Sequence, residues 1–251
     1  MALISNLYTV AKKDWRWAYL NNPVEEIRQP TVKNERSRRI FENIRIYGTT
    51  PMECPSSEIA WMLRESRSET LPTIVTLAIE TAMRRSELVN IRRNDIDFET
   101  GTIFIADSKN GTSRYVPLSP LARYTLITYL AKKNPPNKLF NISAGAISRA
   151  FNRALHKARQ KYEKLSQSKN QENNPNYLID LRFHDLRHEA TSRLAEIYEM
   201  HELAKITGHK DTRMLLRYYH PDVVKLTQKL AQSHQGQEQF NAINQMLLQL
   251  M

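Results

Sequence analysis

The chain has 251 residues, of which 41% are hydrophobic, so it can bury a sizeable core and is not a disordered chain. Its formal net charge of +11 favours a polyanionic partner, either nucleic acid or an anionic membrane surface, over a merely basic protein. The single cysteine, Cys54, excludes a disulfide within the chain and argues against a cysteine-based zinc site.

The chain shows no sequence signal for a membrane. No apolar run approaches the roughly 18–20 residues that a membrane-spanning helix needs. The first residues lack the order of basic start, apolar stretch and small-residue cleavage site that marks a signal peptide. We therefore expect a cytoplasmic protein without a membrane partner, and nucleic acid becomes the leading partner.

The first part of the chain combines one helical segment with a basic stretch. Apolar residues at helical spacing predict a helix over residues 3–20, which the following Asn-Asn-Pro ends. Residues 27–40 are basic and poor in large apolar side chains, which is typical of an extended linker. We expect residues 1–26 to be the remaining helix of a separate N-terminal unit, and residues 27–55 to be a linker with an insertion.

From residue 56 the pattern becomes strongly helical. The sequence PSSEIAWMLRES opens with a helix cap, and the largely apolar TLPTIVTLAIETAM predicts a buried helix. The stretch RRSELVNIRRNDIDF continues with a short helix and then turns toward strand. Beyond it, the β-rich runs TIFIA and RYVPL flank Asn110-Gly111, which is a strong hairpin signal.

The second half of the chain is again mostly helical. Three further helical stretches lie at residues 119–132, 144–162 and 184–218. The polar residues 163–178 predict a surface loop, and the glutamine-rich residues 233–239 predict that the tail, residues 223–251, breaks into two helices. The expected fold class is therefore mainly α with a small antiparallel β-sheet or hairpin (α+β).

Four stretches place a reactive or phosphate-binding residue type in a suggestive setting. They are TAMRRSEL at 81–88, DSKNGTSR at 107–114, HDLRHE at 184–189 and GHKDTRMLLRYYHPD at 208–222. Taken singly, each has a structural interpretation: a solvated helix end, a lysine at a turn tip, a structural His-Arg pair and an amphipathic core tyrosine. The four stretches follow one another in the order Arg, Lys, His-x-x-Arg, His, Tyr. A purely structural explanation would have to hold for all four at once, which favours a functional interpretation.

In these stretches the chain resembles the tyrosine recombinases, also called the phage integrase family. TAMRRSEL resembles the Thr-Gly-φ-Arg-x-Ser-Glu-Leu segment with Thr-Ala in place of Thr-Gly, and the other three stretches resemble the lysine hairpin, the His-x-x-Arg box and the His-nine-Tyr segment. The resemblance covers residues 70–222 well. It implies a catalytic domain over residues 56–222 with the tyrosine-recombinase fold, preceded by one helix of a DNA-binding domain.

The register of the four boxes assigns site residues. The resemblance implies the catalytic set Arg84, Lys109, His184, Arg187, His209 and Tyr218. Glu87 matches the acidic residue that supports the first arginine. Counting nine residues from His209 selects Tyr218 as the nucleophile, and leaves Tyr219 as a packing or positioning residue.

The activity that the resemblance implies is site-specific DNA recombination, in which strands are cleaved and rejoined through a 3′-phosphotyrosyl intermediate. The two arginines would hold the nonbridging oxygens where charge develops. His184 would accept the tyrosine proton or bind phosphate, Lys109 would protonate the leaving 5′ oxygen, and His209 would hydrogen-bond the phosphate. No metal or other cofactor is needed when arginines play this role, and no ATP, because the covalent bond conserves the phosphodiester energy.

The expected partner is double-stranded DNA, bound by a homo-tetramer in the synaptic complex at the nucleoid, with accessory DNA-bending proteins as further partners. The DNA-binding candidates are Arg36, Arg38 and Arg39 in the linker, and Arg149, Arg153 and Lys157 along the basic helix, which continues to Arg159 and Lys161. A solvated charged face is the alternative for that helix. The apolar stripe over 240–250 suits packing on a neighbouring protomer or in cis. Two other functions stay open: a noncatalytic or truncated DNA-binding remnant of an integrase, and a type IB topoisomerase-like relaxase.

Overall fold

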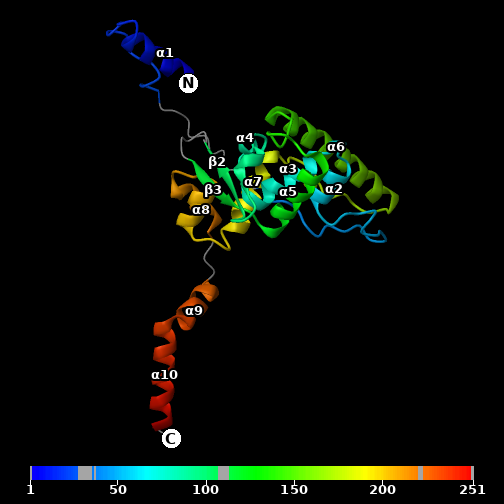
Figure 1. The fold of residues 1–251 in the computed structure, drawn as a ribbon, viewed down its shortest axis with the longest axis vertical. Coiled ribbons are helices and arrows are strands. Elements are labelled where there is room, and N and C mark those ends of the chain that lie inside the picture. Colours follow the sequence, from blue (N-terminus) through cyan, green and yellow to red (C-terminus); the bar gives the residue numbers. More distant parts are fainter. Residues whose placement is uncertain (1, 28–35, 37, 107–112, 220–222, 250–251) are drawn as a thin grey trace. The chain divides into compact units, whose positions relative to one another are not determined.

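The computed structural model describes residues 2–27, 36, 38–106, 113–219 and 223–249 (Figure 1). The chain divides into two compact units, residues 1–37 and residues 38–251. Among the described residues, no helix is both long and apolar enough to cross a membrane. The finer division of the second unit at residues 56 and 222 stays a prediction.

The first unit contains helix α1 (Ala2–Lys13), which is shorter than the helix predicted over residues 3–20. Arg16 adopts a φ of +57°, a left-handed conformation in which a right-handed helix cannot continue. The chain then folds back on α1, and Asn22 Nδ2 donates a hydrogen bond of 3.0 Å to Ser5 Oγ. The rings of Trp15 and Trp17 meet edge to face with centroids 5.5 Å apart.

The second unit is mainly helical with a small sheet, which confirms the predicted fold class. Its helices are α2 (Glu58–Arg64), α3 (Leu71–Thr81), α4 (Arg85–Leu88), α5 (Pro120–Lys133), α6 (Ala144–Ser168), α7 (Phe183–Leu194), α8 (Met200–Thr207), α9 (Val223–Gln232) and α10 (His234–Gln249). Two 3-10 turns are η1 (Arg93–Asp95) and η2 (Thr212–Tyr218). The break between α9 and α10 falls at Ser233, so most of the glutamine-rich stretch belongs to α10 rather than separating two helices.

Three short strands, β1 (Ile96–Asp97), β2 (Thr102–Ile105) and β3 (Arg114–Pro117), form an antiparallel sheet in the order β1-β2-β3. In this register Ile103 lies opposite both Ile96 and Val116. The two predicted hairpin strands are therefore paired as expected. The Asn110-Gly111 turn between them lies outside the described residues.

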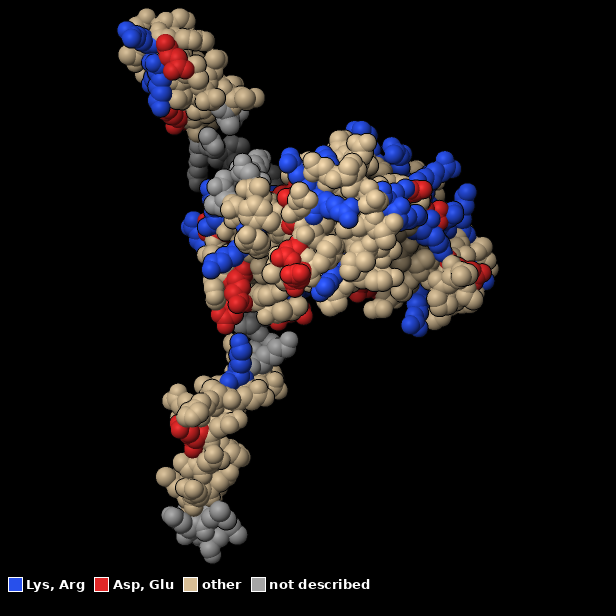
Figure 2. All heavy atoms as spheres, viewed as in Figure 1, with Lys and Arg blue, Asp and Glu red and all other residues tan. Residues whose placement is uncertain are grey.

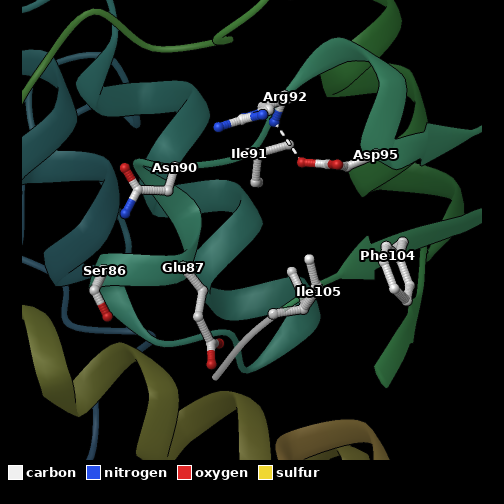
Figure 3. A pocket seen from close by; sticks show the side chains of 9 residues that line it. Ser86, Glu87, Asn90, Ile91, Arg92, Asp95, Phe104 and Ile105 are labelled. Atoms are coloured by element: carbon white, nitrogen blue, oxygen red, sulfur yellow. Dashed lines mark hydrogen bonds between the residues drawn. The ribbon is translucent and has the colours of Figure 1, made fainter. Parts of the chain in front are cut away.

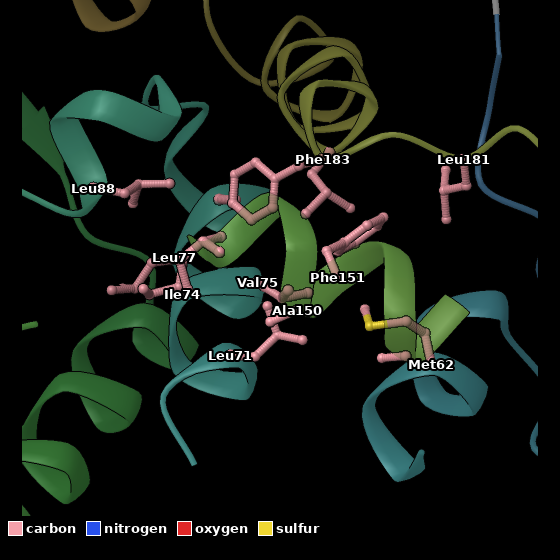
Figure 4. Packing of buried hydrophobic residues seen from close by; sticks show 14 of the residues in the cluster. Met62, Leu71, Ile74, Val75, Leu77, Leu88, Ala150, Phe151, Leu181 and Phe183 are labelled. Carbon is pink, nitrogen blue, oxygen red and sulfur yellow. The ribbon is translucent and has the colours of Figure 1, made fainter. Parts of the chain in front are cut away.

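Helix α3 occupies the centre of the core and packs against α5, α6 and α7 (Figure 4). Its Leu71, Ile74 and Leu77 side chains are fully buried, which explains why this segment is apolar nearly all round rather than along one stripe. Phe151 of α6 and Phe183 at the start of α7 meet beside it with ring centroids 5.8 Å apart. Full burial of each such side chain contributes about 1.5–3 kcal/mol.

Serine side chains begin three of the helices. Ser57, Ser119 and Ser143 are the N-cap residues of α2, α5 and α6, and each Oγ accepts a backbone N–H three residues later, at 3.1, 3.1 and 3.2 Å. Each cap satisfies one of the N–H groups that a helix leaves without an internal partner, which is worth about 1 kcal/mol. These caps help to fix where the three helices start.

The prediction of a surface loop over residues 163–178 is wrong at both ends. Helix α6 continues to Ser168, and Tyr177 is fully buried, because the chain after α6 folds back over the helix. Arg159 fixes the segment that folds back by donating hydrogen bonds of 2.7 Å to the carbonyls of Asn174 and Tyr177. A guanidinium that binds two backbone carbonyls serves the fold there, rather than an exposed basic face.

Residues predicted to form the end of the linker and an insertion contribute to the core. Ile40, Ile46 and Cys54 are buried and belong to the same hydrophobic cluster as α3. Arg38, at the start of the second unit, forms an ion pair with the buried Glu58 of α2. This segment is thus part of the packed unit.

Candidate active site

The first predicted catalytic residue lies in the tight turn between α3 and α4. Ala82 ends α3 with a φ of +51°, the left-handed conformation that glycine adopts without strain and that commonly ends helices. The departure from Thr-Gly therefore leaves the turn formed, with an alanine in the glycine conformation. Arg84 is the N-cap residue of α4, and its backbone N–H donates to Glu87 Oε2 at 2.8 Å.

Glu87 binds two arginines. Its Oε1 accepts a hydrogen bond of 2.9 Å from Arg84 Nη1, which agrees with its predicted supporting role. Both of its oxygens also accept from Arg114 of β3, at 3.0 Å from Nη1 and 2.6 Å from Nη2. Burial would raise the pKa of Glu87, but the hydrogen bonds from Arg114 and Arg84 hold it below its ordinary value.

The sequence patterns did not reveal Arg114. It lies within the hairpin stretch that drew attention to Lys109, and its side chain is buried. The position of Arg114 in the hairpin could have revealed it. The buried Ile103, Ile105 and Val116 show which face of the sheet is buried. Arg114 lies opposite Ile105 in the register, so it belongs to that buried face. A charged residue on a buried face of a sheet needs a partner, and the acidic candidate was Glu87.

Three consecutive backbone carbonyls at the C-terminal end of α8 each accept a hydrogen bond from a different arginine. Ile206 O accepts from Arg114 Nε, Thr207 O from Arg187 Nη2, and Gly208 O from Arg84 Nη2, each at 2.8 Å. The last carbonyls of a helix have no internal partner and carry the negative end of its dipole, so they suit cationic donors. Gly208 adopts a φ of +70°, which ends the helix in a left-handed turn.

Arg187 lies on the inner side of α7 and is almost completely buried. Its Nη1 donates to Ala82 O, so the carbonyls of residues 82 and 207 hold the guanidinium from two sides. Burial, together with the nearby charge of Arg84, lowers its pKa to about 10. Arg187 is therefore still charged at neutral pH, although its two hydrogen-bonded carbonyl partners are neutral.

This cluster is electrostatically unbalanced. Arg84, Arg114 and Arg187 are three cations, and Glu87 is the carboxylate that ion-pairs with two of them. Arg84 and Arg114 lower the pKa of Arg187 by charge repulsion, which shows that the guanidinium groups act on one another. Two positive charges that the cluster does not neutralise favour binding of an anion.

Tyr218 lies at the end of η2, in contact with α7. Its Oη is 2.5 Å from His188 Nδ1 and accepts a hydrogen bond of 2.8 Å from Arg217 Nη2. His188, which Tyr218 contacts, directly follows Arg187 in α7. The sequence patterns revealed neither His188 nor Arg217, although His188 lies one helical turn after His184.

The neighbouring Tyr219 has a different environment. Its hydroxyl donates a hydrogen bond of 2.7 Å to the carbonyl of Tyr198, and burial raises its pKa. An occupied hydroxyl with a raised pKa is a poor nucleophile. The two tyrosines therefore have different environments, and the choice of Tyr218 as nucleophile stays a prediction.

The two predicted histidines flank the arginines from different elements. His184, in the first turn of α7, has its pKa lowered by burial and by Arg187. His209 follows Gly208, with its Nδ1 2.6 Å from Thr207 Oγ1. Burial and the charges of Arg187 and Arg84 lower the pKa of His209 to about 4, so it is neutral at pH 7.

The last predicted catalytic residue, Lys109, lies outside the described residues. Next to that gap is a cavity of about 420 Å³ between α4, η1 and β2 (Figure 3). Glu87 and Ile105 line it, with Asp95 and Phe104 further along the wall. The cavity borders the arginine cluster through Glu87.

The predicted DNA-binding residues divide into buried and exposed groups. Arg38 is 15% exposed and bonded to Glu58 at 2.5 Å, whereas Arg39 is 60% exposed beside Glu189. Arg149, Arg153 and Lys157 are spaced by four along α6; the first two are exposed and Lys157 is half-buried. Figure 2 shows Lys and Arg side chains gathered over α6 on the visible face. Arg36 is partly buried.

Comparison with known proteins places this site in a family. The model of the phage integrase family matches residues 57–224, which contain every arginine, histidine and tyrosine of the site. The chain belongs to the phage integrase family. The family resemblance that the four sequence boxes predict is therefore confirmed.

Individual members of the phage integrase family are also similar to this chain. A shufflon-specific DNA recombinase of Escherichia coli is 34% identical over 234 residues, which cover 92% of this chain and 52% of that protein. A putative integrase/recombinase of Haemophilus influenzae is 29% identical over 92% of this chain and 68% of its own length. The chain thus spans about half the length of the Escherichia coli relative.

A solved structure supports the fold. The Tn1549 transposon integrase in complex with transposon right end DNA matches with a TM-score of 0.57 and 18% identity, over 91% of this chain and 76% of that one. At this identity the match concerns the fold alone, and it agrees with the mainly helical unit and its small sheet.

Proposed function

We propose that this chain is a site-specific DNA recombinase that cleaves and rejoins strands through a 3′-phosphotyrosyl intermediate, without a metal ion or ATP. The observation that carries the proposal is the position of Tyr218 beside the helix that holds Arg187. Tyr218 Oη contacts His188, the residue after Arg187 in α7, and Arg187 and Arg84 bind adjacent carbonyls at the end of α8.

The hydrogen bonds of the two arginines leave donors for a substrate. A guanidinium has five N–H donors. Arg84 donates to Glu87 and Gly208, and Arg187 donates to Ala82 and Thr207, so each arginine retains N–H groups that can bind phosphate oxygens. Because the protein holds both groups before substrate arrives, little reorganisation is needed as charge develops in the transition state.

The reaction would proceed as an in-line displacement at phosphorus. Tyr218 Oη forms the bond to phosphorus, and the bond to the 5′ oxygen breaks, with Lys109 as the proposed proton donor to that oxygen. His184 in the first turn of α7 and His209 after the end of α8 are the proposed hydrogen-bond partners of the phosphate. Attack by a 5′-hydroxyl on the phosphotyrosine reverses the step and joins the strands.

Double-stranded DNA is the proposed partner. The exposed basic stripe of α6 and the net charge of +11 support it, and the Tn1549 integrase of similar fold was solved with DNA. Exchange of two strands on each of two duplexes requires four sites, so we propose a DNA-bound homo-tetramer. The exposed apolar residues of α10, Phe240, Ile243, Met246 and Leu247, are the proposed contact with a neighbouring protomer.

The test is covalent trapping. Nicked duplexes tiled from the DNA on either side of this chain's own coding sequence serve as suicide substrates, because the short cleaved fragment diffuses away and leaves the protein attached. We expect a protein–DNA band on a denaturing gel for the wild type and for Tyr219→Phe, and none for Tyr218→Phe. DNA binding without a covalent band on any duplex would contradict the proposal and favour a noncatalytic DNA-binding protein.

A further inference from the structure

We propose that His188 takes the proton of the Tyr218 hydroxyl during DNA cleavage and that Arg217 stabilises the resulting tyrosinate. This inference rests on the proposed function, because it concerns one step of the same reaction. It assigns to His188 and Arg217 a role that the sequence motifs give to neither residue, and it moves the proton acceptor from His184 to the next turn of α7.

The three side chains form a closed triangle of short contacts. His188 Nδ1 lies 2.5 Å from Tyr218 Oη, and Arg217 Nη2 lies 2.8 Å from that oxygen and 2.9 Å from His188 Nδ1. The His188 and Tyr218 rings are 28° from parallel with centroids 6.2 Å apart, and Arg217 Cζ lies 4.9 Å from the Tyr218 ring centroid. The nucleophilic oxygen is thus in direct contact with one base and one cation.

The contact with arginine decides which atom of His188 carries a hydrogen. A guanidinium only donates hydrogen bonds, so the Nδ1 atom that it approaches at 2.9 Å presents a lone pair. Tyr218 Oη accepts from the same arginine and still has its own hydrogen to donate. The consistent arrangement is Tyr218 O–H donating to His188 Nδ1, which is the direction in which the proton must move.

The surroundings keep His188 neutral at pH 7, although they also make it a weaker base. Burial lowers its pKa to about 4, with further lowering by the charges of His184 and Arg217. The ionisable groups that act on it are His184, Asp185 and Arg187 from α7, and Arg217 and Tyr218 from η2. Asp185 opposes the shift by favouring the protonated ring, and so would stabilise the imidazolium that forms during the reaction.

The proposed step balances in protons and electrons. As Tyr218 Oη bonds to phosphorus, its proton passes to His188 Nδ1, and the electron pair of the breaking P–O5′ bond leaves with the 5′ oxygen, which is protonated by a separate acid. In the rejoining direction the His188 imidazolium returns its proton to the departing Tyr218 oxygen. Arg217 neutralises the phenolate in both directions. His184 remains beside Arg187, free to bind the phosphate.

The first experiment measures the single-turnover rate of covalent adduct formation on the trapping duplexes as a function of pH. His188→Asn keeps a hydrogen-bond acceptor near the position of Nδ1 but cannot take a proton, and His188→Ala removes both properties. We expect both variants to be slower by about 10²–10⁴-fold at neutral pH and to gain about tenfold per pH unit, while the wild type is insensitive to pH above about 6. Added imidazole should restore His188→Ala.

The matched control is His156→Asn, since His156 is an exposed histidine on α6 whose ring bonds to Gln160. It should cleave like the wild type. If His188→Asn also cleaves at the wild-type rate, His188 only positions the tyrosine and the proposal is wrong. Arg217→Gln should slow cleavage as well, and an unchanged rate would remove Arg217 from the step.

A second measurement separates this inference from the proposed function, because it needs no cleavage. Nitrogen NMR of the free protein with labelled histidine should show His188 neutral at pH 7, with its hydrogen on Nε2 and an Nδ1 signal that moves in Tyr218→Phe. A hydrogen on Nδ1, or a signal indifferent to Tyr218, would overturn the inference even if the wild type cleaves DNA. If instead the wild type forms no adduct, the proposed function fails, and the role assigned to His188 fails with it.

Discussion

Arg84 and Gly208, 124 positions apart in the chain, are joined by a hydrogen bond of 2.8 Å from Nη2 to the glycine carbonyl. A side chain at this glycine would crowd the arginines. A Cβ at this position would lie 3.2 Å from Arg84 Nη1 and 3.1 Å from Arg114 Nη1. The end of α8 therefore fixes the arginine cluster both through its carbonyls and through the absence of a side chain.

Gly208→Ala should reduce both stability and cleavage. A non-glycine residue at a φ of +70° costs about 1–2 kcal/mol, and the added methyl must push two guanidinium groups by a few tenths of an ångström. We expect adduct formation to slow by about tenfold or more, because catalysis is sensitive to small misplacements. Gly101→Ala is the control, since Gly101 has a φ of +67° with nothing within 4 Å of its added Cβ. Similar stability loss with full activity there would tie the cleavage defect to the arginines, and an active Gly208→Ala would refute it.

Arg114→Lys tests whether the fork geometry matters beyond charge. Lysine keeps the charge but cannot bind both oxygens of Glu87 and the carbonyl of Ile206 at once. We expect the free energy of unfolding in urea to fall by about 1–3 kcal/mol, with slower adduct formation because the Glu87 carboxylate that binds Arg84 is no longer held by both of its oxygens. Arg123→Lys on exposed α5 should change neither quantity. Equal behaviour of the two variants would show that Arg114 contributes charge alone.

Arg38 and Arg39, both predicted to bind DNA, should behave differently. Arg38→Gln leaves the fully buried Glu58 carboxylate without its cation, so we expect a stability loss of about 3–5 kcal/mol. Arg39→Gln removes an exposed cation from Glu189, which still pairs with Arg193, and should cost less than about 1 kcal/mol. Urea denaturation of both variants measures this. Two equally stable variants would contradict the structural role of Arg38.

The histidines of the site predict acid sensitivity. His188 and His209 have pKa values of about 4 in the folded chain, below the value of 6.5 of an unperturbed histidine. Below pH 6.5 the unfolded chain therefore binds protons that the folded chain does not, and stability falls as pH drops from about 6.5 to about 4. Urea midpoints at several pH values measure the slope. His188→Asn and His209→Asn together should flatten it, whereas His156→Asn should not, and a slope unchanged by the double variant would contradict the assignment.

The basic stripe of α6 should govern the salt dependence of DNA binding. Removing one side chain that binds a phosphate lowers the steepness of log affinity against log salt by about 0.9. We expect Arg149→Gln, Arg153→Gln and Lys157→Gln to lower this steepness on a nonspecific duplex, and Lys132→Gln on exposed α5 to leave it unchanged. A salt dependence that is the same for all four variants would show that α6 is only a solvated charged face.

The sequence predicts the fold class and the order of the site elements because these depend on local patterns. A largely apolar run predicts α3, a helical pattern predicts α5, and β-rich runs around a turn predict β2 and β3. The long return after α6 escapes such reasoning, because Tyr177 is buried by tertiary contacts in a stretch that is polar overall.

Sequence motifs predict the side chains of the candidate site, but they do not predict the backbone groups that hold those side chains in place. The boxes predict Arg84, Arg187 and Tyr218, but no motif reveals that the carbonyls of residues 206–208 hold the arginines. His188 was hidden for another reason. Its role depends on the ring of Tyr218, 30 positions later, being oriented toward α7.

The position of α8 late in the chain also determines when, during synthesis, the arginine cluster can assemble. During synthesis Arg84 and Arg187 leave the ribosome before residues 206–208, whose carbonyls hold them, and Tyr218 follows last. A nascent or truncated chain therefore contains both arginines without the assembled cluster. In the proposed function, the ability to break a DNA strand arises only with the completed fold, so a half-made copy of the chain lacks it.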